Sequence, residues 1–168
     1  MHLGECFYDH LTRFLREPAR QSVFSIGAHL PSIQILEYDR IFAACRVFCS
    51  FGLTHYHPEL HSLCEIMLPI DDAWDAIPTL FTNALNVMIM RSIRLAPGTA
   101  LNGLATIDPN FVERYRKHAL YFTLPFDLPD AFASVDCGTV TGHVYLPKFR
   151  PNKRRGAAHT CVSRTQTA

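Results

Sequence analysis

Three histidines and a cysteine lie close together in one short segment, with the spacing His55-x-His57-x-x-x-His61-x-x-Cys64. Imidazole nitrogen and thiolate sulfur are ligands that suit Zn²⁺. The spacing matches none of the standard zinc patterns, and Cys64 alternates with the apolar Ile66, as a residue on the buried face of a strand does. We therefore interpret the segment as a polar turn with exposed histidines. A zinc enzyme that uses these four residues remains the alternative hypothesis.

A thiol enzyme would need a cysteine beside a histidine and an anion-stabilising group. His118 and His143 are the histidines that lie in strand-like segments, so they are the candidate bases. The N-terminus does not have the pattern of a secretory signal, and the chain is long enough to form a core without disulfides. We therefore predict reduced thiols, packed in the core. The six cysteines are Cys6, Cys45, Cys49, Cys64, Cys137 and Cys161.

Other polar residues suggest structure rather than catalysis. The turn around Pro97-Gly98 and Gly103 does not have the glycine spacing of a phosphate-binding loop. Asp71, Asp72 and Asp75 precede an apolar periodic segment, and acids there favour the start of a helix. We thus predict no catalytic residue, no bound metal and no cofactor.

Charge is unevenly distributed along the 168 residues, although the net charge is only +1. Residues 1–147 contain 10 Lys/Arg and 15 Asp/Glu, whereas residues 148–168 contain six Lys/Arg and no acid. We predict one domain over 1–147 and a basic, disordered tail over 148–168. An acidic body repels phosphates, so we expect a protein partner rather than nucleic acid. No apolar run is long enough for a membrane span, and we predict a cytoplasmic protein.

The periodicity of apolar residues predicts a helix over 5–17 and strands over 32–38, 46–53 and 62–70. A long helix is predicted from residue 73 to about 93, with Asp71 or Asp72 as its N-cap and Trp74 on its apolar side. Pro78 leaves open a start of the helix proper at that residue. A short helix over 108–115 and strands over 118–125 and 139–146 follow. Because adjacent strands are joined by short links, the predicted fold class is α+β, with a mainly antiparallel sheet packed against helices in an α/β sandwich.

Several of these segments carry a family resemblance. The segment Ser50-Phe-Gly-Leu53, the strand Glu65-Ile-Met-Leu-Pro-Ile70 and then Trp74 resemble the core of the suppressor of fused domain. The Pro97-Gly98 turn and the strands before Pro125 and Pro147 are similar to later parts of that domain. The resemblance covers about residues 20–147. The basic tail and the histidine-rich turn depart from the family pattern.

The resemblance implies a non-catalytic domain that binds protein partners, and the length favours the bacterial kind, which looks like immunity proteins that neutralise toxins. We expect the partner, for example a basic toxin domain, to meet the turn and the acids that follow it. A structural scaffold subunit is a further alternative. The predicted partner-binding residues are Phe51, Gly52, His55, Tyr56, His57, Glu59, Asp71, Asp72 and Asp75.

Overall fold

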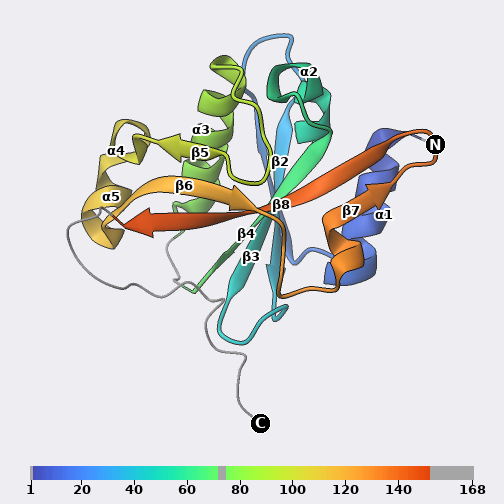
Figure 1. The fold of residues 1–168 in the computed structure, drawn as a ribbon. Helices are drawn as coiled ribbons and strands as arrows, with labels where there is room; N and C mark the ends of the chain where they lie inside the picture. Colours follow the sequence, from blue (N-terminus) through green and yellow to red (C-terminus); the bar gives the residue numbers. More distant parts are fainter. Residues whose placement is uncertain (1, 72–74, 152–168) are drawn as a thin grey trace.

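The computed structural model describes residues 2–71 and 75–151, in which helices cover both faces of a sheet (Figure 1). The helical elements are α1 (Leu3–Leu15), η1 (Leu53–Tyr56), α2 (His57–Leu60), α3 (Ile77–Met90), α4 (Leu104–Ile107), α5 (Pro109–Tyr115) and η2 (Asp130–Ala133). The strands are β1 (Arg20–Phe24), β2 (Ile33–Asp39), β3 (Arg46–Phe51), β4 (Cys64–Ile70), β5 (Ala100–Asn102), β6 (Lys117–Thr123), β7 (Ser134–Asp136) and β8 (Thr141–Pro151). The predicted α+β class is confirmed.

The sheet has the strand order β1-β2-β3-β4-β8-β6-β5, and β7 pairs with β8. The long strand β8 connects its two parts, because it pairs with β4 and β7 in its first half and with β6 in its second half. The β4–β8 pair is parallel, over residues 64–66 and 143–145, and the other pairs are antiparallel. The mainly antiparallel sheet is therefore as predicted.

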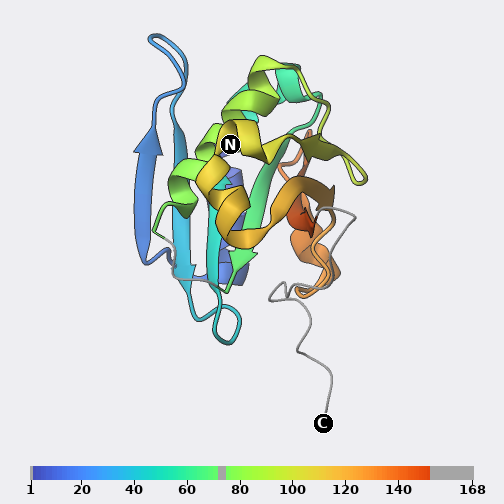
Figure 2. The ribbon, with the colours of Figure 1, turned by 90° about the vertical axis from the view of Figure 1, so that its left-hand side faces the viewer.

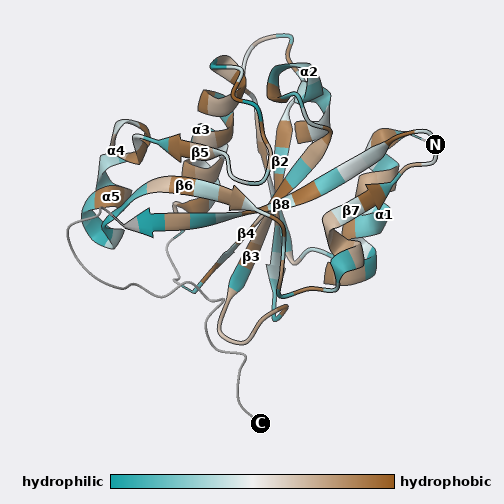
Figure 3. Cartoon of the chain, in the orientation of Figure 1, coloured by the Kyte–Doolittle hydropathy of each residue, from teal (hydrophilic) through white to brown (hydrophobic). Residues whose placement is uncertain are grey.

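Two hydrophobic cores lie on the two faces of the central strands. In β2, Ile33 and Ile35 belong to the core under α3, whereas Leu36 and Tyr38 belong to the core under α1. This alternation follows from the two-residue period of a strand. All residues of β4 are buried, since helices cover both of its faces. Apolar residues are brown in Figure 3, and Figure 2 shows β1 at the outer edge of the sheet.

Two reciprocal capping hydrogen bonds stabilise the start of α1. The imidazole of His2 accepts a hydrogen bond from the Gly4 amide, and Glu5 accepts one from the His2 amide. Phe7, Leu11 and other apolar side chains of α1 are buried at helical spacing, which confirms the predicted helix. Among the described residues, no helix has the length and apolar character that a bilayer crossing requires.

Helix α3 begins later than the predicted start at residue 73. Its N-cap is Ala76 and Pro78 lies in its first turn, so no aspartate caps this helix. Asp71 is exposed at the end of β4, and Asp72 and Trp74 lie outside the described residues. Proline at the first helical positions costs no hydrogen bond, which explains why the helix proper begins there.

Three short strands, β1, β5 and β7, were not predicted, and the polar turn between β3 and β4 forms two short helices. The predicted start of the tail is also wrong. Residues 148–151 belong to β8 and pair with β6, and the Phe149 ring packs 4.9 Å from the Phe111 ring. Residues 152–168 lie outside the described part of the chain.

Candidate functional site

Polar side chains gather on η1 and α2, at the end of the sheet where β4 begins (Figure 1). His55, His57 and His61 are exposed, and Glu59 is half-buried. We call these four residues the η1–α2 surface. His57 is partly oriented, because its Nδ1 lies 3.2 Å from the Thr54 carbonyl oxygen. Four of the predicted contact residues therefore lie on or beside one short helical segment: His55, Tyr56, His57 and Glu59.

A buried carboxylate from the neighbouring strand holds this segment in place. Glu65 is fully buried, and its Oε1 accepts hydrogen bonds from the backbone amides of Gly52 at 2.9 Å and Thr54 at 3.3 Å. The Ser50 hydroxyl donates to Glu65 Oε2 at 2.6 Å. The Glu65 side chain thus satisfies amides at the start of η1 that have no partner within the helix.

Burial and these hydrogen bonds act on Glu65 in opposite directions. Loss of solvent raises the pKa of the Glu65 carboxyl to about 7, and the hydrogen bonds from Ser50, Thr54 and Gly52 oppose part of that rise. Desolvation disfavours the charged form, whereas donors aimed at the carboxylate favour it. The group beneath the η1–α2 surface consequently titrates near neutral pH.

Gly52 makes the turn into η1 possible. Its φ of 98° is a left-handed conformation that other residues rarely adopt, and a Cβ there would lie 3.1 Å from the Ser32 carbonyl oxygen. Phe51 precedes it, half-buried, with its ring edge-on to Tyr8 at 5.7 Å. Tyr56 is only 3% exposed and its hydroxyl donates to the Pro31 carbonyl oxygen. Tyr56 is therefore a core residue, which corrects its place among the predicted contacts.

The predicted acidic contacts lie at the opposite end of β4. Asp71 and Asp75 are exposed there, and Asp75 lies 3.6 Å from Arg46 Nη1. Arg46 also pairs with the buried Glu37 at 2.8 Å. A strand of seven residues is about 23 Å long, so these acids and the η1–α2 surface are two separate regions. Asp72 lies outside the described residues.

The structure does not bring His55, His57 and His61 together with Cys64 as a zinc site would require, whereas His143, a candidate base, is the register partner of Cys64 in the β4–β8 pair. Cys64 is fully buried in the core under α3, and burial raises the pKa of its thiol. His55, His57 and His61 are exposed at the surface instead. Across residues 2–71 and 75–151, no group of three or more His, Cys, Asp or Glu side chains is arranged to hold a metal ion.

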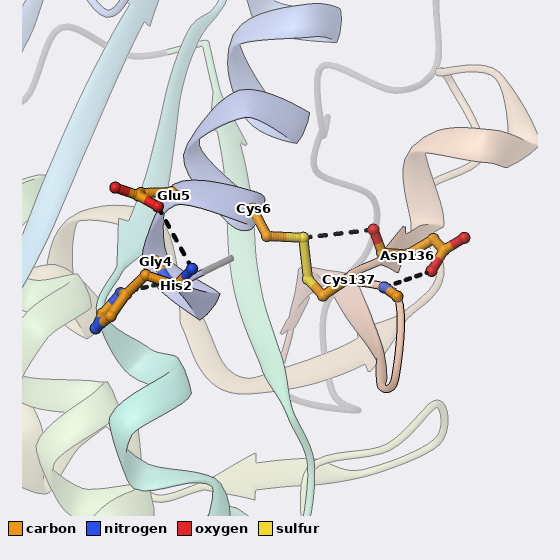
Figure 4. The surroundings of a disulfide bond; sticks show 7 residues. His2, Gly4, Glu5, Cys6, Asp136 and Cys137 are labelled. Carbon is orange, nitrogen blue, oxygen red and sulfur yellow. Dashed lines mark hydrogen bonds between the residues drawn. A yellow bond between two sulfur atoms is a disulfide. The ribbon is translucent and has the colours of Figure 1, made fainter.

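A disulfide between Cys6 and Cys137 overturns part of the prediction of reduced thiols (Figure 4). The bond joins the first turn of α1 to the residue after β7, and the Asp136 carbonyl oxygen lies 3.4 Å from Cys6 Sγ. Cys45 is not a free thiol either. Cys49 and Cys64 are free and buried, as predicted. The prediction rested on the N-terminal pattern and the chain length, and neither reports which cysteines meet across 131 residues of sequence.

Sequence reasoning also missed the role of Ser50 and Glu65, which were noted only as part of a family motif. One signal could have found them, since Glu65 is the only acid within the apolar segment 64–70. A charged residue in a strand that is buried on both faces needs polar partners. The nearest polar residue on the preceding strand is Ser50.

Neither a protein-family model nor a curated protein matches this sequence. The structure is similar to a crystal structure from Neisseria gonorrhoeae that is named as that of a SUFU (suppressor of fused protein) homolog. The TM-score is 0.63, with 13% sequence identity, over 86% of this chain and 75% of that chain. At this identity the likeness shows a suppressor of fused-like fold, which confirms the fold that the sequence motifs implied.

Proposed function

We propose that this chain, which has a suppressor of fused-like fold, is a non-catalytic protein-binding domain, and specifically an immunity protein that neutralises a toxin. The observation that carries the proposal is the η1–α2 surface. Its three histidine side chains are exposed to solvent on a segment that the buried Glu65 carboxylate holds in place. Interfaces whose conformation is fixed before association lose less entropy on binding.

Burial keeps the Cys64 thiol from ionising, which favours binding over catalysis. Nucleophilic catalysis requires a thiolate within hydrogen-bond reach of its base. Cys64 lies instead in an apolar core with a raised thiol pKa, while His55 and His57 are exposed.

Charge suggests the nature of the partner. Acids outnumber bases by five over residues 1–147, and the exposed Asp71 and Asp75 belong to this excess. An acidic domain attracts a basic partner and accelerates the encounter. A cationic toxin, such as a nuclease domain, has the required charge.

The disulfide bears on the compartment in which such a protein would act. A disulfide such as Cys6–Cys137 persists in oxidising surroundings and is rare in the cytosol, which does not agree with the predicted cytoplasmic location. An immunity protein that acts outside the cytoplasm agrees with the disulfide better.

The direct test is isothermal titration calorimetry with the purified product of the neighbouring gene. We expect saturable binding, and at least 10-fold weaker binding for the double variant His55→Ala/His57→Ala, a loss of about 1.4 kcal/mol or more. His29→Asn is the matched control, because His29 is also exposed but lies between β1 and β2. Asparagine tolerates the positive φ of that position.

Two results would contradict the proposal. One is the absence of binding together with no protection of cells that express the neighbouring protein. The other is an unchanged affinity of the histidine double variant combined with a weaker affinity of Val23→Lys. Val23 is 61% exposed on the edge strand β1, so this result would place the interface on β1 instead.

A further inference from the structure

We propose that the C-terminal segment 152–168 is a strap, which a disulfide between Cys45 and Cys161 ties over a cleft at the β2–β3 loop and which a dithiol reductant releases. The cleft has a volume of about 470 Å³, and its wall includes Asp39, Cys45 and Asp71. It lies at the end of the sheet opposite the η1–α2 surface, because Asp39 ends β2 and Asp71 follows β4. Features of the described residues support segment 152–168, which lies outside them, as the occupant.

The cysteines of the chain leave one partner for Cys45. Cys45 is disulfide-bonded. The other cysteines in the described part of the chain are the bonded pair Cys6–Cys137 and the free, buried Cys49 and Cys64. Because the chain has six cysteines, Cys161 is the one that remains within the same chain.

The sheet topology brings the start of segment 152–168 toward the end of the sheet that carries Cys45. β4 and β8 are parallel, so β8, which ends at Pro151, leaves β4 in the direction of the end of β4. Ile70 at that end is the register partner of Arg46, the residue after Cys45.

The segment is long enough to reach the cleft. Only β4 separates β8 from β3 in the strand order, and neighbouring strands lie about 4.8 Å apart. Cys161 lies ten residues after Pro151, and ten extended residues span up to about 33 Å. This length allows for the divergence of β8 toward β6 in its second half.

Charge at the cleft adds to the effect of the bond. The segment has three consecutive bases at 153–155 and no acid. Asp39 and Asp71 are exposed at the cleft. Arg40 and Arg46 also line it, but Arg46 is already paired with a buried carboxylate at 2.8 Å. Opposite charges therefore attract the segment, whereas the bond is what selects it as the occupant.

Reduction of the bond opens the strap. One thiolate of a dithiol attacks a sulfur of the Cys45–Cys161 bond, and its second thiolate then displaces the mixed disulfide. Two electrons and two protons pass to the two cysteines, and the reductant becomes a cyclic disulfide. Because Cys45 lines a surface cleft, the bond is open to a small reductant.

The first test is a tryptic map of the full chain, after alkylation of free thiols under denaturing, non-reducing conditions. Cys45 and Cys161 are the single cysteines of the tryptic peptides 41–46 and 156–164, and the two buried free thiols share peptide 47–91. We expect 41–46 and 156–164 to be joined and to separate after treatment with dithiothreitol. Peptide 47–91, alkylated twice, is the internal control. An alkylated Cys161 in the wild type, or a bond found only between two copies of the chain, would overturn the proposal.

Cys161→Ser then distinguishes a strap that covers the cleft from a tether that leaves it open. The substitution lies outside the packed core and leaves the Cys6–Cys137 bond intact. We expect faster carbodiimide labelling of the Asp71 carboxyl in Cys161→Ser than in the wild type, and equal labelling of Glu113, which is exposed on α5. Ser163→Ala is the matched control variant and should label like the wild type. Equal labelling of Asp71 in Cys161→Ser and the wild type would show an uncovered cleft and overturn the proposal.

Discussion

Ser50 donates its hydroxyl hydrogen to Glu65 across 2.6 Å, and both side chains are fully buried between β3 and β4. The same hydroxyl oxygen accepts the amide of Ile66 at 2.8 Å. The regular pairing of β3 with β4 ends at Cys49 and Met67, directly beside this contact. The Ser50 and Glu65 side chains therefore replace the next hydrogen bonds of the β3–β4 pair, at the point where the chain turns into η1.

Removal of this acceptor should destabilise the fold. Glu65→Ala leaves the Ser50 hydroxyl and the Gly52 and Thr54 amides without their partner, so we expect a loss of about 2–4 kcal/mol in the free energy of unfolding. Urea denaturation measures it. Glu113→Ala, at an exposed position on α5, should change stability by less than about 0.5 kcal/mol. Equal effects of the two substitutions would show that the Glu65 contacts contribute nothing.

The pKa of Glu65 predicts a pH dependence of stability. The pKa of this carboxyl is about 7 in the folded chain, against an ordinary value of 4.5, so the folded state binds more protons than the unfolded state between these pH values. Stability should thus decrease as pH rises from about 4.5 to 7, by up to about 3 kcal/mol. The difference between the wild type and Glu65→Gln isolates this contribution, since the amide does not titrate. Parallel pH profiles for the two proteins would contradict it.

Gly52 offers a test of backbone strain. Gly52→Ala must adopt a φ of 98° and place a Cβ 3.1 Å from the Ser32 carbonyl oxygen, so we expect a loss of about 2–4 kcal/mol. Gly138→Ala has a similar φ of 83° with no atom within 4 Å of the Cβ, and it should lose only about 1–2 kcal/mol. Thermal unfolding of both variants gives the comparison. If Gly138→Ala is equally costly, the contact with Ser32 is irrelevant.

Substitutions of the two bonded cysteines should have non-additive effects on the free energy of unfolding. Cys6→Ala and Cys137→Ala each remove the same bond, which links positions 131 residues apart, so each should cost about 2–5 kcal/mol. The double variant should cost no more than either single one. Peptide mapping under non-reducing conditions verifies the pairing in the wild type. The bond would be excluded if the two stability losses add in the double variant, or if Cys6 and Cys137 are both alkylated as free thiols in the wild type.

Local periodicity predicted much of the framework. The helical spacing of Phe7 and Leu11 identified α1, and the alternation in 33–39 identified β2, because both patterns depend on neighbours within a few residues. The same local signals placed β3, β4, β6 and β8. They also identified the segment with His55 and His57 as exposed and polar, which is how the structure presents it.

Other features depend on residues that are distant in sequence. The three-residue strands β5 and β7 have too little periodicity to recognise, and the parallel pairing of β4 with β8 joins segments about 80 residues apart. The contact of the buried Tyr56 with Pro31 and the Cys6–Cys137 bond also join residues that are distant in sequence. A sequence reports the preferences of each segment, but which segments meet depends on the free energy of the whole packed core.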